Sequence, residues 1–318
     1  MDRRRALVAI PATLALACAR AQTPPVKVLI GFAAGGSVDA LARLAAEAIQ
    51  QGTGRGAIVE SRTGAAGRIA VEAVKSAVPD GDTLLVAPQG PMTLFPHVFR
   101  GLKFDPAKDF VPVSRLAAGD YALTIGPAVP AKDIAGLRSW LKTAGDNATY
   151  GSPGAGTLPH FLGVSIARAM GVSMTHVPYR GSALALNDLA GGTLAAAVSP
   201  VTEALELHKA GRVHIVATAG AVRSPFVEGV PTLKESGIDV DLPSWFALYA
   251  PAATPSATVE RLRAAVHAGL ATPTAKERLG RLGLVPAPSG AAELVALQKR
   301  EAEMWGAVVK ASGFTPED

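Results

Sequence analysis

Residues 26–49 read VKVLIGFAAGGSVDALARLAAEAI, and this stretch decides the fold. Its first seven residues, 26–32, are mostly β-branched or apolar and predict a buried strand. A turn rich in glycine follows at 33–36. Ser37 is then expected to cap a helix whose apolar residues recur every three or four positions. A strand, a glycine turn and a helix in this order are typical of α/β proteins.

The same order of elements recurs along most of the chain, which predicts an α/β fold throughout. The last third differs, because after one apolar strand its pattern is helical only. Helices without strands to cover are expected to return to the first half of the chain and pack against it. The predicted strands are 58–61, 83–87, 148–151, 172–177, 195–199, 213–218 and 245–250, and the predicted helices are 68–77, 157–170, 183–190, 256–270, 274–282 and 291–311.

The first 21 residues have the three regions of a secretory signal peptide. Residues 3–5 are all arginine, a short apolar stretch follows, and residues 19–21 read Ala-Arg-Ala. About a dozen apolar residues are too few to cross a bilayer. We therefore expect cleavage after Ala21 and a mature chain that is exported to the periplasm, by the general or the twin-arginine route.

Cys18 is the only cysteine, and it lies inside this first segment. The residues before it match a lipoprotein signal poorly, so we interpret it as part of the apolar stretch. Its removal leaves a mature chain without cysteine. That excludes disulfides, thiolate metal sites and a cysteine nucleophile.

The charge balance gives no sign of a nucleic-acid partner. The chain has 31 Lys and Arg against 26 Asp and Glu, but four of the Arg and one of the Asp lie within the first 21 residues. The mature chain therefore has 27 basic and 25 acidic residues, without a basic tract that contains interleaved aromatics. Its 297 residues suit two lobes of ordinary domain size.

Four turns between a strand and a helix could carry chemistry, at 32–39, 151–160, 179–182 and, more weakly, 199–202. The first amides of a helix have no intrahelical acceptor and carry partial positive charge, so turns of this kind favour anions. Ligands of open α/β sheets also bind beyond the carboxyl ends of the strands. Glycine and serine in such turns are equally ordinary connection chemistry, so each turn alone has two interpretations.

Local motifs for catalysis are missing. The sequence has no G-x-S-x-G and no H-E-x-x-H, and residues 35–37 lack the lysine of a P-loop. The glycines at 52–56 have the wrong spacing for dinucleotide binding, and no histidines are paired at metal-ligand spacing. We predict no enzymatic activity, no cofactor and no metal. A Ser/His/Asp set assembled only in space stays an alternative.

Short segments spread over the mature chain carry a more specific signal than any single turn, through their order and spacing. They are FAAGGSVD at 32–39, VESRTG at 59–64, PDGDTLL at 79–85, FDP at 104–106, YGSPGAGT at 150–157, HVPYRGS at 176–182, PTL at 231–233 and WG at 305–306.

Together these segments resemble the substrate-binding proteins of tripartite tricarboxylate transporters, the Bug (Bordetella uptake gene) family. The resemblance implies a type II periplasmic-binding-protein fold, in which two lobes are joined by a hinge of two crossover strands and the ligand cleft lies between them. Lobe 1 would consist of residues 22–120 and 247–318, and lobe 2 of residues 121–246. It also implies a small mono- or dicarboxylate as ligand and membrane permease subunits as partners, and we expect a monomer.

Position by position, the resemblance implies ligand-binding residues on both sides of the cleft. In lobe 1 they are Ala34, Gly36, Ser37, Asp39 and Gln89, and in lobe 2 they are Ser152, Gly156, Thr157, His160, Tyr179, Gly181, Ser182 and Ser199.

Two positions depart from the family pattern. Ser199 stands where many relatives have an acid, and we hypothesise that the missing acid disfavours an amino acid ligand. Gln89 stands where serine or threonine is common, and we expect it to affect specificity. Two other functions remain open at this point. One is a periplasmic Ser/His hydrolase of esters or amides, and the other is a solute-sensing subunit that contacts a membrane receptor.

Overall fold

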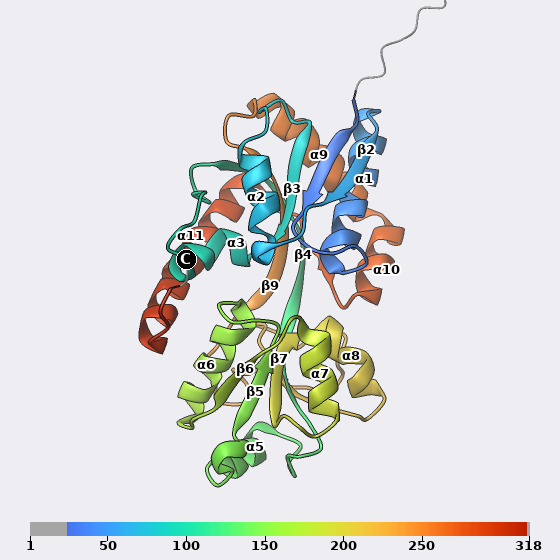
Figure 1. Ribbon diagram of the computed structural model, residues 1–318. Coiled ribbons are helices and arrows are strands. Elements are labelled where there is room, and N and C mark those ends of the chain that lie inside the picture. Colours follow the sequence, from blue (N-terminus) through green and yellow to red (C-terminus); the bar gives the residue numbers. More distant parts are fainter. Residues whose placement is uncertain (1–23, 317–318) are drawn as a thin grey trace, which may run out of the picture.

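The computed structural model describes residues 24–316. The predicted signal peptide, with Cys18, lies outside the described residues. Within residues 24–316, no helix combines the length and the apolar character that a membrane span needs. Figure 1 shows two α/β lobes, one above the other, joined by two long strands.

The strands form one network in the order β2-β1-β3-β9-β4-β7-β5-β6, and β8 and β10 also pair with β4. Pairs β1–β2, β1–β3, β5–β6 and β5–β7 are parallel, whereas β9 and β4 are antiparallel to their neighbours. The bounds are β1 Val26–Ile30, β2 Ala57–Ser61, β3 Thr83–Pro88, β4 Phe110–Ile125, β5 Thr149–Ser152, β6 Thr175–Pro178, β7 Ala196–Pro200, β8 His214–Thr218, β9 Pro243–Pro251 and β10 Val285–Pro286.

Strand β4 belongs to both lobes. Its residues 110–120 pair with β9, and its residues 121–125 pair with β7 and β8. Strand β9 continues the first lobe by pairing with β3. The partner of β4 therefore changes between Asp120 and Tyr121, and the two sheets meet at this point.

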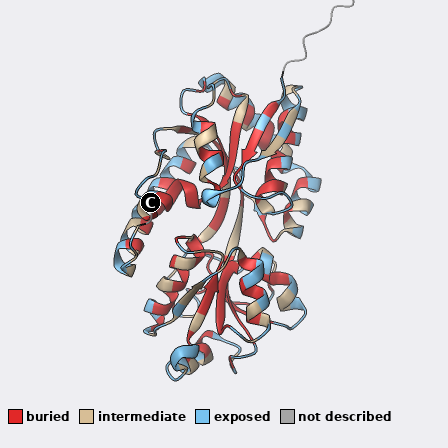
Figure 2. Ribbon diagram, viewed as in Figure 1, coloured by how far each residue is buried: buried red, intermediate tan, exposed pale blue. Residues whose placement is uncertain are grey.

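Helices cover both sheets, and the buried residues follow the strands between them (Figure 2). The helices of the first lobe are α1 Ser37–Thr53, α2 Arg68–Lys75, α3 Gly90–Thr93, α4 Phe95–Val98, α9 Ser256–Ala271, α10 Pro273–Arg281 and α11 Ala291–Ser312, and those of the second lobe are α5 Ile134–Leu141, α6 Leu158–Met170, α7 Ser182–Ala190 and α8 Val201–Lys209.

The C-terminal helices return to the first lobe, which confirms the prediction made from their sequence. Helix α9 packs along α1 through small residues. A Cβ atom added at Gly269 would lie 2.4 Å from the Cβ of Ala48, and one added at Gly52 would lie 2.5 Å from the Cβ of Ala265. The two backbones therefore approach as closely as glycine and alanine allow.

Several details differ from the sequence-based expectation, and the short elements α3, α4 and β10 were not predicted. Gly36, and not Ser37, is the N-cap of α1; its backbone is extended, with φ −85° and ψ 178°, and Ser37 is the first helical residue. Helix α5 has no counterpart in the prediction. It has only eight residues and depends on a local cap, in which the Asp133 carboxylate accepts a hydrogen bond from the Gly136 amide at 2.7 Å.

Candidate ligand-binding cleft

A cleft of about 530 Å³ lies where the two lobes meet. Its walls come from the turns that follow β1 and β3 in the first lobe and β5, β6 and β7 in the second. Its floor comes from β4 and β9, which contribute Asp120, Tyr121, Ser244 and Phe246. The residues that the sequence predicts and that line this cleft are Gly36, Ser37, Thr157, Gly181 and Ser182.

The helices α1, α6, α7 and α8 all begin at this cleft. Each is the next helix after the carboxyl end of a strand, and α8 follows β7 without a turn between them. At α1 the extended Gly36 lets the helix begin at Ser37, and the first amides of that helix have no intrahelical acceptor. At α7 Gly181 has a φ of +111°, which favours glycine. The cleft thus collects several partial positive charges from helix starts.

Asp39 orders the first turn, and neither Asp39 nor Ala34 lines the cleft. The Asp39 side chain accepts hydrogen bonds from the Gly35 amide and from Nε of Arg43, each at 3.0 Å. The hydrogen bond from Arg43 holds the pKa of the Asp39 carboxyl below its usual value. Asp39 is therefore a buried, ionised acid that orders the turn between β1 and α1. Ala34 is an exposed residue of the same turn.

The turn between β5 and α6 is held by its own side chains. The Ser152 hydroxyl is buried, donates to the Gly154 carbonyl at 3.0 Å and lies 2.8 Å from Nε2 of His176. The Gly156 amide donates to Nδ1 of His160 at 3.2 Å. Ser152, Gly156 and His160 thus support the cleft wall from behind, and Pro153 and Thr157 are the residues of this turn that line the cleft.

The rings of His160 and His176 stack on each other with their centroids 3.9 Å apart. Burial lowers the pKa of each imidazole to about 4, so both are neutral at pH 7. The Ser152–His176 contact has the distance of a catalytic dyad, but Ser152 is fully buried and lies outside the cleft lining. In the described part of the chain, no carboxylate hydrogen-bonds to His176 to orient it. This geometry gives a hydrolase no support.

Tyr179 and Ser199 also make contacts inside the second lobe. The Tyr179 hydroxyl donates to the Asp188 carboxylate at 2.8 Å, and Ser199 is buried with its hydroxyl 3.3 Å from the Pro200 carbonyl. Both positions neighbour cleft residues without lining the cleft themselves.

Gln89 ties the end of β3 to β9. It is fully buried, its Oε1 accepts from the Trp245 amide at 2.6 Å, and its Nε2 donates to the Pro243 carbonyl at 3.2 Å. Pro88 and Gly90 line the cleft, whereas Gln89 between them points to the crossover strand. The structure therefore gives Gln89 a supporting position in place of the expected contact with the ligand.

Asp120 and Glu203 line the cleft although the sequence analysis did not select them. Burial raises the pKa of the Asp120 carboxyl, and nearby Asp241 adds to the effect. The pKa of Glu203 is raised by the same cause, partly opposed by the Ser182 hydroxyl. Glu203 is an exposed residue, so water screens this effect. That Ser199 disfavours an amino acid ligand stays a prediction.

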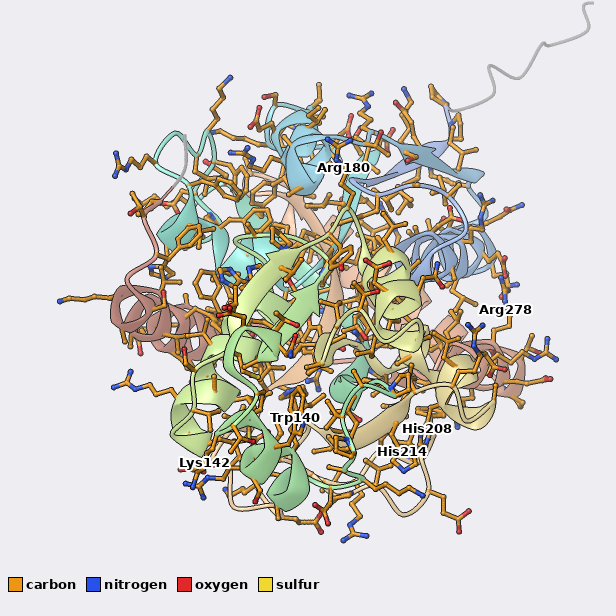
Figure 3. The ribbon with its side chains drawn as sticks, turned by 60° about the horizontal axis from the view of Figure 1, so that its bottom comes forward. Trp140, Lys142, Arg180, His208, His214 and Arg278 are labelled. Carbon is orange, nitrogen blue, oxygen red and sulfur yellow. The ribbon has the colours of Figure 1, made fainter. Side chains whose placement is uncertain are left out.

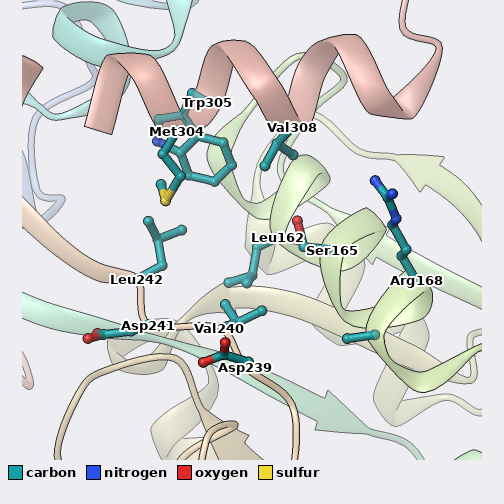
Figure 4. Close-up of a pocket in the computed structure, with 11 residues that line it drawn as sticks. Leu162, Ser165, Arg168, Asp239, Val240, Asp241, Leu242, Met304, Trp305 and Val308 are labelled. Atoms are coloured by element: carbon teal, nitrogen blue, oxygen red, sulfur yellow. The ribbon is translucent and has the colours of Figure 1, made fainter. Parts of the chain in front are cut away.

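Two other features lie apart from the cleft. His208 and His214 lie side by side at the opposite end of α8, with ring centroids 5.6 Å apart (Figure 3). A second hollow of about 480 Å³ lies between α6, residues 239–242 and α11, with a mainly apolar lining (Figure 4). Among residues 24–316, no group of three or more His, Cys, Asp or Glu could hold a metal ion.

Comparison with solved structures shows the same fold over 90 to 92% of the chain. The R. palustris protein Rpa4515 with adipate is 29% identical, with a TM-score of 0.83 over 92% of this chain and 98% of its own. MatC from Rhodopseudomonas palustris with bound malate is 31% identical, with a TM-score of 0.79 over 90% and 98%. The periplasmic binding protein BugD is 28% identical, with a TM-score of 0.80 over 92% and 99%.

These likenesses confirm the predicted resemblance and the α/β periplasmic-binding-protein fold. The family model described as tripartite tricarboxylate transporter family receptor matches residues 41–314. The chain is accordingly a solute-binding protein and not an enzyme, as the sequence predicts. It belongs to the tripartite tricarboxylate transporter receptor family.

Proposed function

We propose that this chain is a periplasmic protein that captures a small carboxylate in the cleft and delivers it to the membrane permease of a tripartite tricarboxylate transporter. The observation that carries the proposal is the start of α1. There Gly36, Ser37 and Val38 line the cleft, the Gly36 backbone is extended, and no side chain caps the first turn of the helix. Relatives of the same fold bind adipate and malate, which supports a carboxylate as the ligand.

The physical reason is the cost of burying a charge. A carboxylate that leaves water needs hydrogen-bond donors for its oxygens. The free amides at a helix start supply such donors, and no cationic side chain has to be buried beside the ligand. In this proposal Gly36, Ser37, Thr157, Gly181 and Ser182 contact the ligand. The residues that hold the turns in place are Ala34, Asp39, Gln89, Ser152, Gly156, His160, Tyr179 and Ser199.

The two strands that connect the lobes are proposed as the hinge. Residues 22–120 and 247–318 would move as one lobe and residues 121–246 as the other, with β4 and β9 bending near Asp120 and Pro243. Supporting this division, β4 exchanges one set of partners for another between Asp120 and Tyr121. Closure around the ligand would exclude water from the cleft. We expect the protein to act as a monomer.

Binding is tested by thermal unfolding and calorimetry of the exported chain with mono-, di- and hydroxycarboxylates. A ligand at 100 times its Kd is expected to add about 2.7 kcal/mol to the free energy of unfolding. No stabilisation by any carboxylate would refute the proposal. Uptake of the identified ligand should then require this protein in the cell that makes it.

Ser37→Pro tests the role of the α1 start. Proline is tolerated at the first helical position, because that amide has no intrahelical acceptor, and its fixed φ suits the helix. The variant removes both the amide donor and the hydroxyl at the cleft. We expect its Kd for the carboxylate to rise about tenfold or more, with little change in melting temperature.

Ser37→Ala is the matched control, since it removes the hydroxyl and keeps the amide. It should weaken binding less than Ser37→Pro does. Unchanged affinity in both variants would place the carboxylate elsewhere in the cleft.

A further inference from the structure

The hollow between α6, residues 239–242 and α11 has one wall from each lobe (Figure 4). Helix α11, which returns to the first lobe, contributes Met304, Trp305 and Val308 to one wall. The opposite wall, with Val240, belongs to the second lobe. The width of the hollow therefore depends on the angle between the lobes, as the width of the cleft does.

The hollow and the cleft lie on opposite faces of β9. Side chains alternate between the two faces of a strand, and Ser244 and Phe246 line the cleft. Trp245 between them points the other way, where its indole nitrogen donates to the Glu301 carboxylate of α11 at 2.9 Å. The residues of α11 that line the hollow begin one turn after Glu301. The connecting strand thus separates the two spaces.

The two spaces respond in opposite directions when the connecting strands bend. A rotation about β4 and β9 that brings the walls of the cleft together moves α11 away from α6 and residues 239–242. A rotation that narrows the hollow widens the cleft. Contacts across the hollow are therefore lost when the cleft closes, and their free energy opposes closure.

Contacts between the two walls exist at the edge of the hollow. The ring of Phe161 in α6 packs against Trp305 of α11 and against Phe314 beyond the helix, with centroids 6.5 and 5.3 Å apart. Met304 on α11 and Val240 on the other wall face the hollow and are only half-buried. Because the removal of apolar surface from water is favourable, the two walls attract each other.

We infer that the packing of α11 against α6 and residues 239–242 holds the cleft open, so that residues behind the hinge set the affinity for the ligand without touching it. This inference rests on the proposed function and on the hinge at β4 and β9. The apparent Kd equals the intrinsic Kd divided by the fraction of molecules in the closed state. Any weakening of the packing across the hollow should therefore tighten binding.

Met304→Gln tests the inference, because it keeps the length of the side chain and lowers its attraction to the opposite wall. Val240→Thr makes a comparable change from the other wall and should act in the same direction. Spin labels on Ile69→Cys and Leu184→Cys report the opening. Both residues are exposed, one on α2 and one on α7, and a chain that begins after residue 21 has no other cysteine.

Pulsed dipolar electron paramagnetic resonance of the ligand-free protein measures the distance between the labels. Each hollow variant should raise the population with the shorter distance about twofold or more over the labelled parent. For a carboxylate that the parent binds, calorimetry should show a Kd that falls by the same factor.

Met174→Gln is the matched control, because Met174 is a half-buried residue of the second lobe that lines neither the hollow nor the cleft. It should leave the distances unchanged. Distances that stay the same or lengthen in both hollow variants would overturn the inference, whether or not a carboxylate binds. Shortened distances in a protein that binds no carboxylate would support the inferred role of the hollow and refute the proposed function alone.

Discussion

At the scale of single residues, Gln89 shows how a side chain next to the cleft can support the strand β9 that connects the lobes. Its amide group bonds to the backbone of β9 at two points, the Trp245 amide and the Pro243 carbonyl. Both partners lie in the segment where β9 leaves the second lobe. Because Gln89 is fully buried, water cannot replace these bonds.

Gln89→Met is expected to lower the free energy of unfolding by about 2 to 4 kcal/mol, because it leaves two backbone groups of β9 without a partner. Urea unfolding followed by circular dichroism measures this change. Gln50→Met is the control, since Gln50 is an exposed residue of α1, and it should change stability by less than about 0.5 kcal/mol. A loss of ligand affinity at unchanged stability would instead favour the role in specificity that the sequence suggested.

At the scale of elements, the contact between α1 and α9 reverses the usual effect of glycine in a helix. Alanine normally stabilises a helix interior by about 1 kcal/mol relative to glycine. At Gly269, however, the added methyl group would lie 2.4 Å from the Cβ and 3.2 Å from the Cα of Ala48. Relief of that overlap requires the two helices to move apart.

Gly269→Ala should therefore destabilise the protein by about 1 to 3 kcal/mol. Gly280→Ala in α10 is the matched comparison, because the nearest atom to its added methyl group is 4.0 Å away. That variant should gain up to about 1 kcal/mol from helix propensity. Thermal unfolding of the two variants beside the parent protein measures both changes. Melting temperatures that shift equally and in the same direction would contradict the predicted overlap between α1 and α9.

Elements of this kind were largely predictable from the sequence, and their side-chain directions were not. The glycine turn at 33–36 marked the start of α1 to within one residue, because turn chemistry is local. The turn at 151–160 looked similar, yet Ser152 and His160 face inward to His176 and Gly156. Asp120 and Glu203 reach the cleft through the pairing of β4 with β9 and β7, which no local pattern encodes.

At the scale of the whole molecule, α11 holds the crossover region. Glu301 on α11 is 5% exposed, and its carboxylate accepts a hydrogen bond from the Trp245 indole nitrogen of β9 at 2.9 Å. Burial raises the pKa of Glu301 to about 7, and the Trp245 hydrogen bond opposes that shift. Beyond this point the helix reaches the second lobe, where Phe314 packs against Phe161 and His160.

The raised pKa of Glu301 makes stability depend on pH. Below about 4.5 the carboxyl is protonated in both folded and unfolded chains. Between about 4.5 and 7 the unfolded chain releases its proton while the folded protein retains it, so the free energy of unfolding falls as the pH rises. Above about 7 the loss is complete, and it amounts to about 3 kcal/mol for this group.

Glu301→Gln should remove this dependence and keep an acceptor for Trp245. Relative to the parent protein, the variant should gain about 3 kcal/mol in free energy of unfolding when the pH is raised from 4.5 to 8. Urea unfolding at both pH values measures it. Glu303→Gln makes the same change of charge at an exposed position of α11, and its difference should stay constant. A constant difference for Glu301→Gln as well would show that Glu301 titrates normally.

The placement of the tryptophans gives this molecule an optical reporter of its own motion. Trp245 lies on β9 at the crossing, and Trp305 of α11 lies with its ring centroid 6.5 Å from that of Phe161 in the second lobe. Trp140, the third, is on α5 at the far end of the second lobe (Figures 1 and 3). Bending at the proposed hinge would change the surroundings of the first two indoles and leave Trp140 as a steady background. Intrinsic fluorescence should therefore follow closure in solution without any attached dye.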